Sequence, residues 1–287
     1  MKIGMNLLLW TGHVTEQHFP VLQALKATGF DGVEVPVFDP SDPGHYRALG
    51  RRLDDMGLER TAVTVIPDAS HSPISPDPAA RQAAGDYLLK VIDCCAELGA
   101  ELLAGPWFQV LGDFTGQGPT ETELDHCAEV HRRIAKPARD AGIICSLEPL
   151  NRFECHLLNT CEQSSAYLER LNEDGFGMLF DTFHANIEEK DPVAALLTAY
   201  DRGDVNHVHI SENDRGTPGS GHAPISETIA ALKSRGYEGW LTIEAFGRGL
   251  KDLAAATKVW RDFAESPEVV YREGFTHIKN HWKKAKR

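Results

Sequence analysis

Short apolar runs alternate with amphipathic stretches along the whole chain. Eight such runs span residues 3–10, 32–37, 61–66, 101–105, 143–147, 177–180, 205–208 and 240–243. The last four are rich in branched or aromatic residues and are flanked by glycine or polar residues, which is typical of strands buried on both faces. Stretches with helical periodicity fill the gaps. The sequence therefore predicts a regular alternation of strands and helices.

Residues that begin and end helices fit this alternation. Thr120 and Glu123 have the spacing of a capping box, and an apolar helix face follows them. Asp191 and Pro192 supply an N-cap and a proline for a first helical turn. Gly99 falls between a helix and the next strand, where a left-handed residue commonly ends a helix.

The alternation favours a parallel sheet that closes on itself, a (β/α)8 TIM barrel. Crossovers between parallel strands are right-handed, and eight of them complete a barrel, which commonly uses about 250 residues. We therefore expect residues 1–287 to form a single domain, with 267–287 as an extra C-terminal helix that covers a barrel face or joins a partner subunit. An open doubly wound sheet is the alternative, but its usual Gly-rich phosphate loop is missing after the first strand.

Composition and charge disfavour several kinds of partner. The net charge of −13 disfavours nucleic acid, because nonspecific binding depends on Lys and Arg side chains that neutralise phosphates. No apolar run approaches the roughly 18 residues that a membrane span requires, and the N-terminus resembles a strand and not a secretion signal. The six cysteines show no C-x-x-C spacing, which is typical of reduced thiols. We expect a cytoplasmic protein with neither a membrane nor a nucleic-acid partner.

Four residues that can bind a metal close successive apolar runs. Glu148, Asp181, His209 and Glu244 follow one another at intervals of 33, 28 and 35 residues, each about one strand-plus-helix unit. In a parallel barrel the carboxyl ends of the strands converge on one rim, so these side chains should meet around one point. Each residue taken singly could be a capping or salt-bridging group at a strand end. All four in register favour a bound cation, because buried charges need a partner.

The composition of this group indicates its chemistry. Three carboxylates and one imidazole suit Mn²⁺, Mg²⁺ or Co²⁺ better than a thiolate-type zinc site. A cation that bridges a carbonyl and a neighbouring hydroxyl oxygen acidifies the carbon-bound proton. Glu148 and Glu244 lie on well-separated strands, so one could stand on each side of a sugar carbon and invert it. Asp181 and His209 are better suited to being ligands only.

Longer connectors at 67–78, 107–119 and 211–224 follow predicted strands. Loops after the strands build the active site in this architecture. Trp107, Phe108, Phe114 and His71 lie in these loops and form either a pocket wall, with Trp107 against the substrate, or a hydrophobic cluster within the loops.

Four segments carry a further signal: 148–154 (EPLNRFE), 181–189 (DTFHANIEE), 207–215 with its H-V-H and E-N-D-R strings, and 243–246 (IEAF). They closely resemble the ketose 3-epimerase family, which includes D-tagatose, D-allulose (psicose) and L-ribulose 3-epimerases, within the xylose-isomerase-like barrels. The resemblance runs over essentially the whole chain. Family members often have Met-Glu-Pro-Phe on the last strand and Trp in place of Ile225, differences that bear on recognition of the C4 to C6 end of the sugar.

The resemblance implies a divalent metal, usually Mn²⁺, held by the four residues that close the strands, with Co²⁺ or Mg²⁺ as alternatives. Glu148 and Glu244 would exchange the C3 proton of a free ketose through a cis-enediolate. Glu154, His184 and Arg215 would hydrogen-bond the O1 to O3 end of the sugar. A homodimer or homotetramer is also implied.

Other activities are compatible with the same barrel. Aldose-ketose isomerisation of the hydroxypyruvate-isomerase type could use the same cation and glutamates. An abasic-site endonuclease would need a multi-zinc cluster with more histidines and a grip on phosphates, which the acidic balance disfavours. A sugar-binding protein without catalysis is disfavoured because both candidate proton-transfer glutamates are present. Neither the preferred ketose nor the choice between dimer and tetramer follows from the sequence.

Overall fold

The computed structural model, which describes residues 1–286, is a closed barrel of eight parallel strands in sequence order. The strands are β1 (Lys2–Asn6), β2 (Gly32–Pro36), β3 (Glu59–Val63), β4 (Leu102–Gly105), β5 (Ile144–Leu147), β6 (Phe176–Asp181), β7 (Val205–Ile210) and β8 (Trp240–Ile243). Pairing of β1 with β8, in which Met5 lies opposite Ile243, closes the sheet. The predicted TIM barrel is confirmed.

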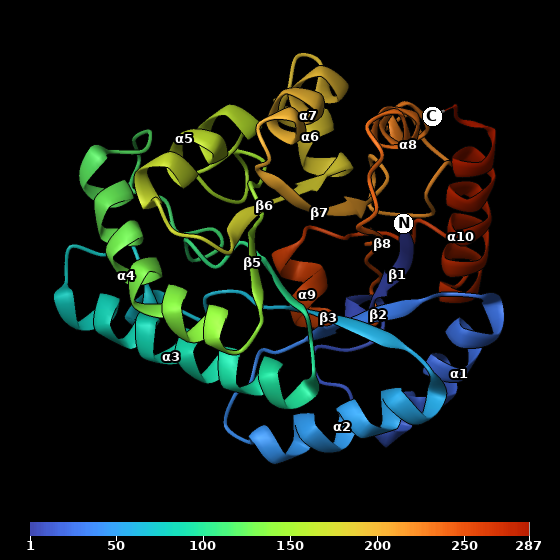
Figure 1. Cartoon of the computed structure of the whole chain (residues 1–287), viewed down its shortest axis with the longest axis horizontal. Helices are drawn as coiled ribbons and strands as arrows, with labels where there is room; N and C mark the ends of the chain where they lie inside the picture. The colour runs from blue at the N-terminus through green and yellow to red at the C-terminus, as the bar shows by residue number, and fades with distance from the viewer. Residues whose placement is uncertain (287) are drawn as a thin grey trace.

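Helices surround the barrel (Figure 1). They are α1 (Phe19–Thr28), α2 (Pro43–Met56), α3 (Pro78–Leu98), α4 (Glu121–Asp140), α5 (Cys161–Leu171), α6 (Thr182–Glu188), α7 (Pro192–Asp201), α8 (Ile225–Ser234), α9 (Lys251–Ala256) and α10 (Pro267–Lys284), with short 3₁₀ turns η1 (Leu7–Leu9), η2 (Glu16–His18) and η3 (Ala69–His71). Within residues 1–286, none of the helices combines the length and the apolar character needed to cross a membrane.

The expected helix caps are present. The Thr120 hydroxyl accepts a hydrogen bond from the Glu123 amide at 3.2 Å, and the Glu123 carboxylate accepts one from the Thr120 amide at 2.8 Å, which is a complete capping box. The Asp191 carboxylate accepts from the Ala194 amide at 3.0 Å. Gly99 ends α3 with a φ of 72°, a left-handed conformation that favours glycine. Local sequence therefore sets where these helices begin and end.

The C-terminal part of the chain supplies two helices with different positions. The predicted C-terminal helix is present as α10, which contacts α1, α8, β1 and β8 and so fills the place in the ring between α1 and α8 (Figure 1). The shorter α9 contributes Ala254 to a small apolar cluster with Leu8, Val63 and Phe246. Leu8 follows β1 and Val63 ends β3, so α9 covers part of the carboxyl rim of the barrel.

The two faces of a strand differ in polarity, as β2 illustrates. Val33 and Val35 belong to the main apolar cluster together with residues of the surrounding helices, such as Leu53 of α2. Glu34 lies between them and hydrogen-bonds to polar side chains of other strands, such as Asn6 of β1. Because side chains alternate along a strand, the outer face packs on helices and the inner face fills the barrel. The barrel interior is therefore where polar chemistry is concentrated.

Candidate active site

Four side chains at the carboxyl rim point toward one another. Glu148 and Glu244 directly follow β5 and β8, Asp181 ends β6, and His209 lies one residue before the end of β7. One ligand atom from each lies within 4.8 Å of the others. His209 Nδ1 is 3.7 Å from Glu148 Oε1, 3.6 Å from Asp181 Oδ2 and 3.4 Å from Glu244 Oε1. The structure thus brings together the four residues that close successive strands.

The atoms that face this point carry lone pairs and are buried. Among residues 1–286, Glu148 Oε1, Asp181 Oδ2 and His209 Nδ1 are buried without a hydrogen-bond partner. A buried polar atom left unpaired costs roughly 1–3 kcal/mol. Three such atoms turned toward the same point, with a further carboxylate beside them, fit an oxygen-rich divalent cation site. The residues present therefore suit the cation that the sequence predicts.

Asp181 joins a strand to a helix as well as facing this point. Its Oδ1 accepts hydrogen bonds from the amides of Phe183 and His184 at 2.5 and 3.4 Å, so it is the N-cap of α6. The cap fixes the carboxylate and leaves Oδ2 directed at His209. Burial opposes the charged carboxylate, but His209 and His184 nevertheless hold the pKa of Asp181 below its usual range.

The two glutamates are buried beside other negative groups. Burial, followed by the charges of Glu244 and Asp181, raises the pKa of Glu148 well above its usual range, although His209 partly opposes this effect. Burial and Asp181 raise the pKa of Glu244 to about 7, again against the effect of His209. Like charges that share one buried site raise pKa values in this way, and a bound cation relieves the repulsion.

Glu34 lies behind His209 and did not emerge from the sequence as a site residue. Its Oε1 is 2.7 Å from His209 Nε2 and its Oε2 is 2.9 Å from His207 Nε2. Glu34 and both imidazoles are completely buried. Burial opposes its charge, but His209 and His207 hold the pKa of Glu34 far below its usual range. The sequence did contain one indication of this role, a single glutamate inside the apolar β2 segment. A carboxylate buried there requires hydrogen-bond partners.

A second cluster lies next to the four rim residues and contains Glu154, His184 and Arg215. Arg215 Nη2 is 3.1 Å from Glu154 Oε1 and 3.2 Å from His184 Nε2. His184 Nε2 is in turn 3.8 Å from Glu148 Oε1, which connects the two clusters. Asn151 Nδ2 donates to Glu154 Oε1 at 3.0 Å. The three residues that the family resemblance assigns to the sugar therefore lie together, beside the candidate cation site.

His184 is held as a neutral hydrogen-bond donor. Its Nδ1 accepts from the Asn151 amide at 3.0 Å, so in the neutral ring Nε2 carries the hydrogen. Burial lowers the pKa of His184 to about 4, with Arg215 adding to this effect while Glu154 and Asp181 oppose it. An Nε2–H group and an Arg215 N–H group consequently point at the same region. Two donors side by side call for an acceptor, which a sugar oxygen can supply.

The Arg215 guanidinium is oriented by stacking and by an unusual backbone conformation. Its central carbon lies 4.2 Å from the ring centre of Phe183 and 4.9 Å from that of Phe246. The residue has a φ of 63°, which the backbone hydrogen bonds to Glu212 and Phe246 hold in place. Such left-handed geometry in a non-glycine residue stores strain and is commonly found at functional sites. Considering residues 1–286, its Nε and Nη1 are buried without a partner.

A cavity of about 470 Å³ opens onto this second cluster. Glu154 and Arg215 are among its polar lining residues, and Phe153, Ile187 and Phe263 contribute apolar side chains to its wall. Phe153 is 72% exposed, so this wall is open to solvent. The volume is within the range of small-molecule sites. The cavity therefore gives a substrate access to the Glu154–Arg215 pair.

The structure places Trp107 away from both clusters. Its side chain is completely buried, with its ring 4.8 Å from that of His131 in α4 and 5.9 Å from that of Phe176 in β6. Its carbonyl lies 3.4 Å from His131 Nε2. Trp107 is thus packed in the layer between the barrel and α4. The sequence placed Trp107 in a loop after a strand but did not indicate whether its ring would face the substrate site or the surrounding helices.

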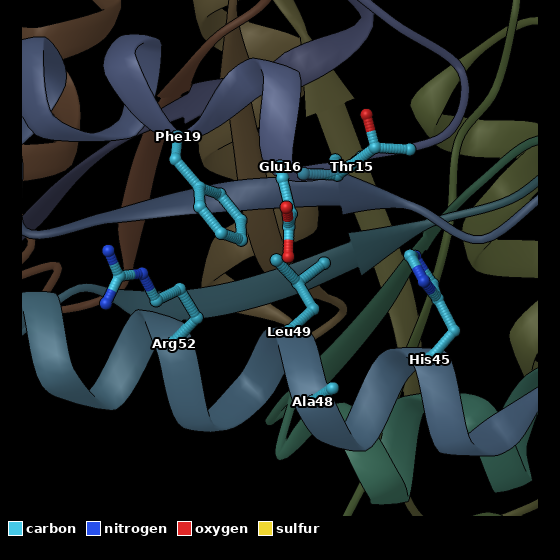
Figure 2. Close-up of a pocket in the computed structure, with 8 residues that line it drawn as sticks. Thr15, Glu16, Phe19, His45, Ala48, Leu49 and Arg52 are labelled. Carbon is cyan, nitrogen blue, oxygen red and sulfur yellow. The ribbon is translucent and has the colours of Figure 1, made fainter.

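A groove on the helical exterior is separate from the rim. It has a volume of about 570 Å³, shares no lining residue with the two clusters, and lies between η2 and α1 on one side and α2 on the other. Figure 2 shows Glu16 and Phe19 facing Leu49 and Arg52 across it. The Arg52 guanidinium lies 5.1 Å from the Phe19 ring centre. The four rim residues come from other elements, so this groove does not contribute to the candidate cation site.

Known proteins are similar to this chain in sequence. The family described as "Xylose isomerase-like TIM barrel" matches residues 22–281, which gives the class of barrel. A ketose 3-epimerase of Arthrobacter globiformis is 34% identical over 273 residues, covering 94% of this chain and 93% of the relative. An L-ribulose 3-epimerase of Mesorhizobium japonicum is 30% identical over 267 residues, covering 91% and 87%.

Solved structures agree with these relatives. The D-allulose 3-epimerase from Methylomonas sp. in complex with D-allulose superposes with a TM-score of 0.88 at 28% identity, covering 98% of this chain and 97% of that one. The chain belongs to the ketose 3-epimerases, carbohydrate isomerases within the xylose isomerase-like TIM barrels.

Proposed function

We propose that this enzyme inverts the configuration at C3 of a free ketose through a cis-enediolate. The observation that carries the proposal is a pair of buried glutamates, Glu148 and Glu244, within the cluster of four rim residues. This cluster lies beside the second cluster of Glu154, His184 and Arg215. These glutamates follow β5 and β8, which are not neighbours in the barrel. They therefore approach the same point from different sides, as inversion of a carbon requires.

Glu148, Asp181, His209 and Glu244 would hold a divalent cation. We propose Mn²⁺, with Co²⁺ or Mg²⁺ as alternatives, because the ligand set is rich in carboxylates and includes no thiolate. When bound, the cation acts as a Lewis acid that stabilises the negative charge developing on the oxygens next to C3. The unpartnered Glu148 Oε1, Asp181 Oδ2 and His209 Nδ1 support this assignment for residues 1–286.

The two glutamates exchange the C3 proton. One carboxylate removes the proton from one face of C3 while the other, in its acid form, delivers a proton to the opposite face. Because the reaction is reversible, each glutamate serves as base for one epimer and as acid for the other. The raised pKa of Glu244, about 7, suits a group that must exist in both protonation states near neutrality.

The second cluster positions the sugar. The neutral His184 donates from Nε2, and Arg215 offers buried N–H groups that have no partner within residues 1–286. Both suit the carbonyl and hydroxyl oxygens at O1 to O3. Glu154, whose pKa stays below its usual range through Arg215 and His184 despite burial, accepts from a sugar hydroxyl. C4 to C6 then extend along the apolar wall of the cavity.

The reaction is tested with Mn²⁺-loaded protein in D₂O and a panel of D-fructose, D-allulose, D-tagatose, D-sorbose and L-ribulose. We expect C3 epimers that carry one deuterium at C3, read by NMR and chromatography. An aldose as the main product, with deuterium entering at C1 or C2, would replace this proposal by aldose-ketose isomerisation. Glu148→Gln should lose about 10²-fold or more in rate, while the exposed Glu273→Gln serves as the control.

A further inference from the structure

The strongest unassigned feature is the carboxylate of Glu34, in the barrel interior beneath the rim. It sits in the middle of β2 with no exposed surface, and its neighbours Val33 and Val35 pack in the main apolar cluster. A carboxylate in such a place is stable only if its oxygens are fully hydrogen-bonded. Its contacts therefore indicate what it does.

Four donors converge on the two oxygens of Glu34. Oε1 accepts from Asn6 Nδ2 at 2.9 Å and from His209 Nε2 at 2.7 Å. Oε2 accepts from Thr61 Oγ1 at 2.9 Å and from His207 Nε2 at 2.9 Å. An ionised carboxylate has about four lone-pair positions, and all of them are engaged here. This saturation identifies the Glu34–His207–His209 group as a hydrogen-bonded network and not as a second cation site.

The contact with His209 determines which ring nitrogen faces the rim. Because Nε2 donates its hydrogen to Glu34, the neutral ring keeps the lone pair on Nδ1. Nδ1 is the atom that lies 3.4 to 3.7 Å from the Glu148, Asp181 and Glu244 carboxylates. Glu34 thus sets both the tautomer and the angle of the imidazole.

Asn6 extends the same network to a second rim residue. Its Oδ1 accepts from the Leu8 amide at 2.9 Å, which fixes the orientation of the side-chain amide. Its Nδ2 then has two hydrogens to give, one to Glu34 Oε1 at 2.9 Å and one to Glu244 Oε1 at 3.2 Å. Two of the four rim residues are therefore held through Glu34, directly or through Asn6.

We propose that Glu34 is a positioning residue that holds His209 as the Nε2–H tautomer and, through Asn6, orients Glu244 for cation binding. This inference rests on the proposed cation site. Carboxylate–histidine–metal arrangements of this kind fix ligand orientation, and losing the outer carboxylate typically lowers metal affinity 10–100-fold. Glu34 itself does not touch the substrate.

The test is an isothermal titration of Mn²⁺ into the wild type, Glu34→Gln and the exposed control Glu59→Gln, with Mn²⁺ EPR as a second readout. Gln keeps the size of the side chain but puts an NH₂ group where one oxygen accepted hydrogens. We expect one Mn²⁺ per chain, a 10–100-fold weaker affinity only in Glu34→Gln, and a KM for the ketose that stays at the wild-type value when Mn²⁺ is saturating. If Glu34→Gln folds and binds Mn²⁺ with the wild-type affinity, the proposal is overturned. It is also overturned if the wild type binds two Mn²⁺ per chain and Glu34→Gln binds one, because Glu34 would then be a metal ligand itself.

A measurement on the unaltered sequence covers the case in which Glu34→Gln does not fold. In ¹⁵N-histidine protein loaded with ¹¹³Cd²⁺, His209 should show metal coupling at Nδ1 and a bonded hydrogen at Nε2, with assignment by loss of the signals in His209→Asn. Coupling at Nε2 would overturn the inference. Wild-type protein that binds no cation would instead refute the proposed function, so the two failures are distinct.

Discussion

Asp181 uses its two carboxylate oxygens for two different purposes. Oδ1 caps α6, whereas Oδ2 lies 3.6 Å from His209 Nδ1 at the proposed cation site. A single residue at a strand end therefore both begins a helix and completes the rim cluster. The short Asp side chain suits this dual use, whereas the positions directly after β5 and β8 carry glutamate.

Asp181→Asn separates the two purposes. Asn caps helices about as well as Asp, so α6 should be kept. The variant loses the charge interactions with His209 and His184 that lower the pKa of Asp181, so the metal-free protein should unfold slightly below the wild-type temperature at neutral pH. Mn²⁺ affinity should fall by about tenfold or more, equivalent to about 1.4 kcal/mol. Calorimetry measures both quantities. A destabilised variant with unchanged Mn²⁺ affinity would contradict this account.

Protons and the cation should compete for Glu148 and Glu244. In the metal-free protein, burial and neighbouring carboxylates raise the pKa of Glu148 well above its usual range and that of Glu244 to about 7. A raised carboxyl pKa stabilises the fold below the unfolded pKa of about 4.3, and this contribution is lost as the pH rises through about 7. Bound Mn²⁺ relieves that loss, because it binds the ionised groups.

The increase in Tm that Mn²⁺ produces should therefore be larger at about pH 8 than at about pH 6. Differential scanning calorimetry with and without Mn²⁺ gives this difference. The exposed control Glu273→Gln should keep the wild-type pH dependence, and Glu244→Gln should flatten it. A Tm increase that does not change with pH would argue against cation binding by these two carboxylates.

At the scale of elements, the loop between β7 and α8 is organised around Glu212. This carboxylate is 1% exposed and accepts from the backbone amides of Asn213, Gly219 and Ala223 at 3.0, 2.8 and 2.8 Å. The Glu212 carbonyl also accepts from the Arg215 amide at 2.8 Å. One buried side chain thus holds the loop that presents Arg215 to the cavity.

Glu212→Gln should loosen this loop. The NH₂ group cannot accept from a backbone amide, and losing such a charged hydrogen bond costs roughly 1–3 kcal/mol. We expect KM for the ketose to rise about tenfold with Mn²⁺ affinity unchanged, because the loop carries none of the four rim residues. Steady-state kinetics and Mn²⁺ titration test this, with the exposed Glu227→Gln as control. An unchanged KM would show that Arg215 does not depend on Glu212.

For the whole molecule, the sequence predicts those features whose pattern is repeated along the chain or is local to one turn. The alternation of strands and helices, and the spacing of Glu148, Asp181, His209 and Glu244, follow from one structural unit used eight times. The Thr120–Glu123 capping box was predictable because it involves contacts within one turn. The local periodicity of the sequence and the rules of barrel topology are therefore enough to predict the barrel and the position of the four rim residues.

Contacts across the barrel were not predictable in this way. Glu34 contacts His209 from 175 residues away in sequence, and it lies in the middle of its strand, out of register with the four rim residues at the strand ends. The Trp107 ring packs edge-on against His131 of α4 and Phe176 of β6, contacts between distant segments that a single sequence does not reveal. The positions of α9 at the carboxyl rim and of α10 between α1 and α8 likewise depend on contacts with distant parts of the chain.

Removing the cation should affect both stability and activity of the whole protein. Because ligand at 100 times its Kd stabilises a fold by about 2.7 kcal/mol, treatment with a chelator should lower Tm by several degrees and abolish turnover. Added Mn²⁺ should restore both, as followed by calorimetry and an epimer assay. Activity and Tm that survive exhaustive chelation would exclude a metal-dependent mechanism.

The apolar wall formed by Phe153, Ile187 and Phe263 is built by side chains that take no part in the rim cluster. In the proposed binding mode, reaction chemistry and the choice among sugars would be encoded by different sets of residues. Substitutions in the wall would then change the preference between hexuloses and pentuloses, or between sugars that differ at C4, and leave the inversion step intact. On this proposal, the wall is the part of the site in which the sugar preference can be changed without altering the residues that move the proton.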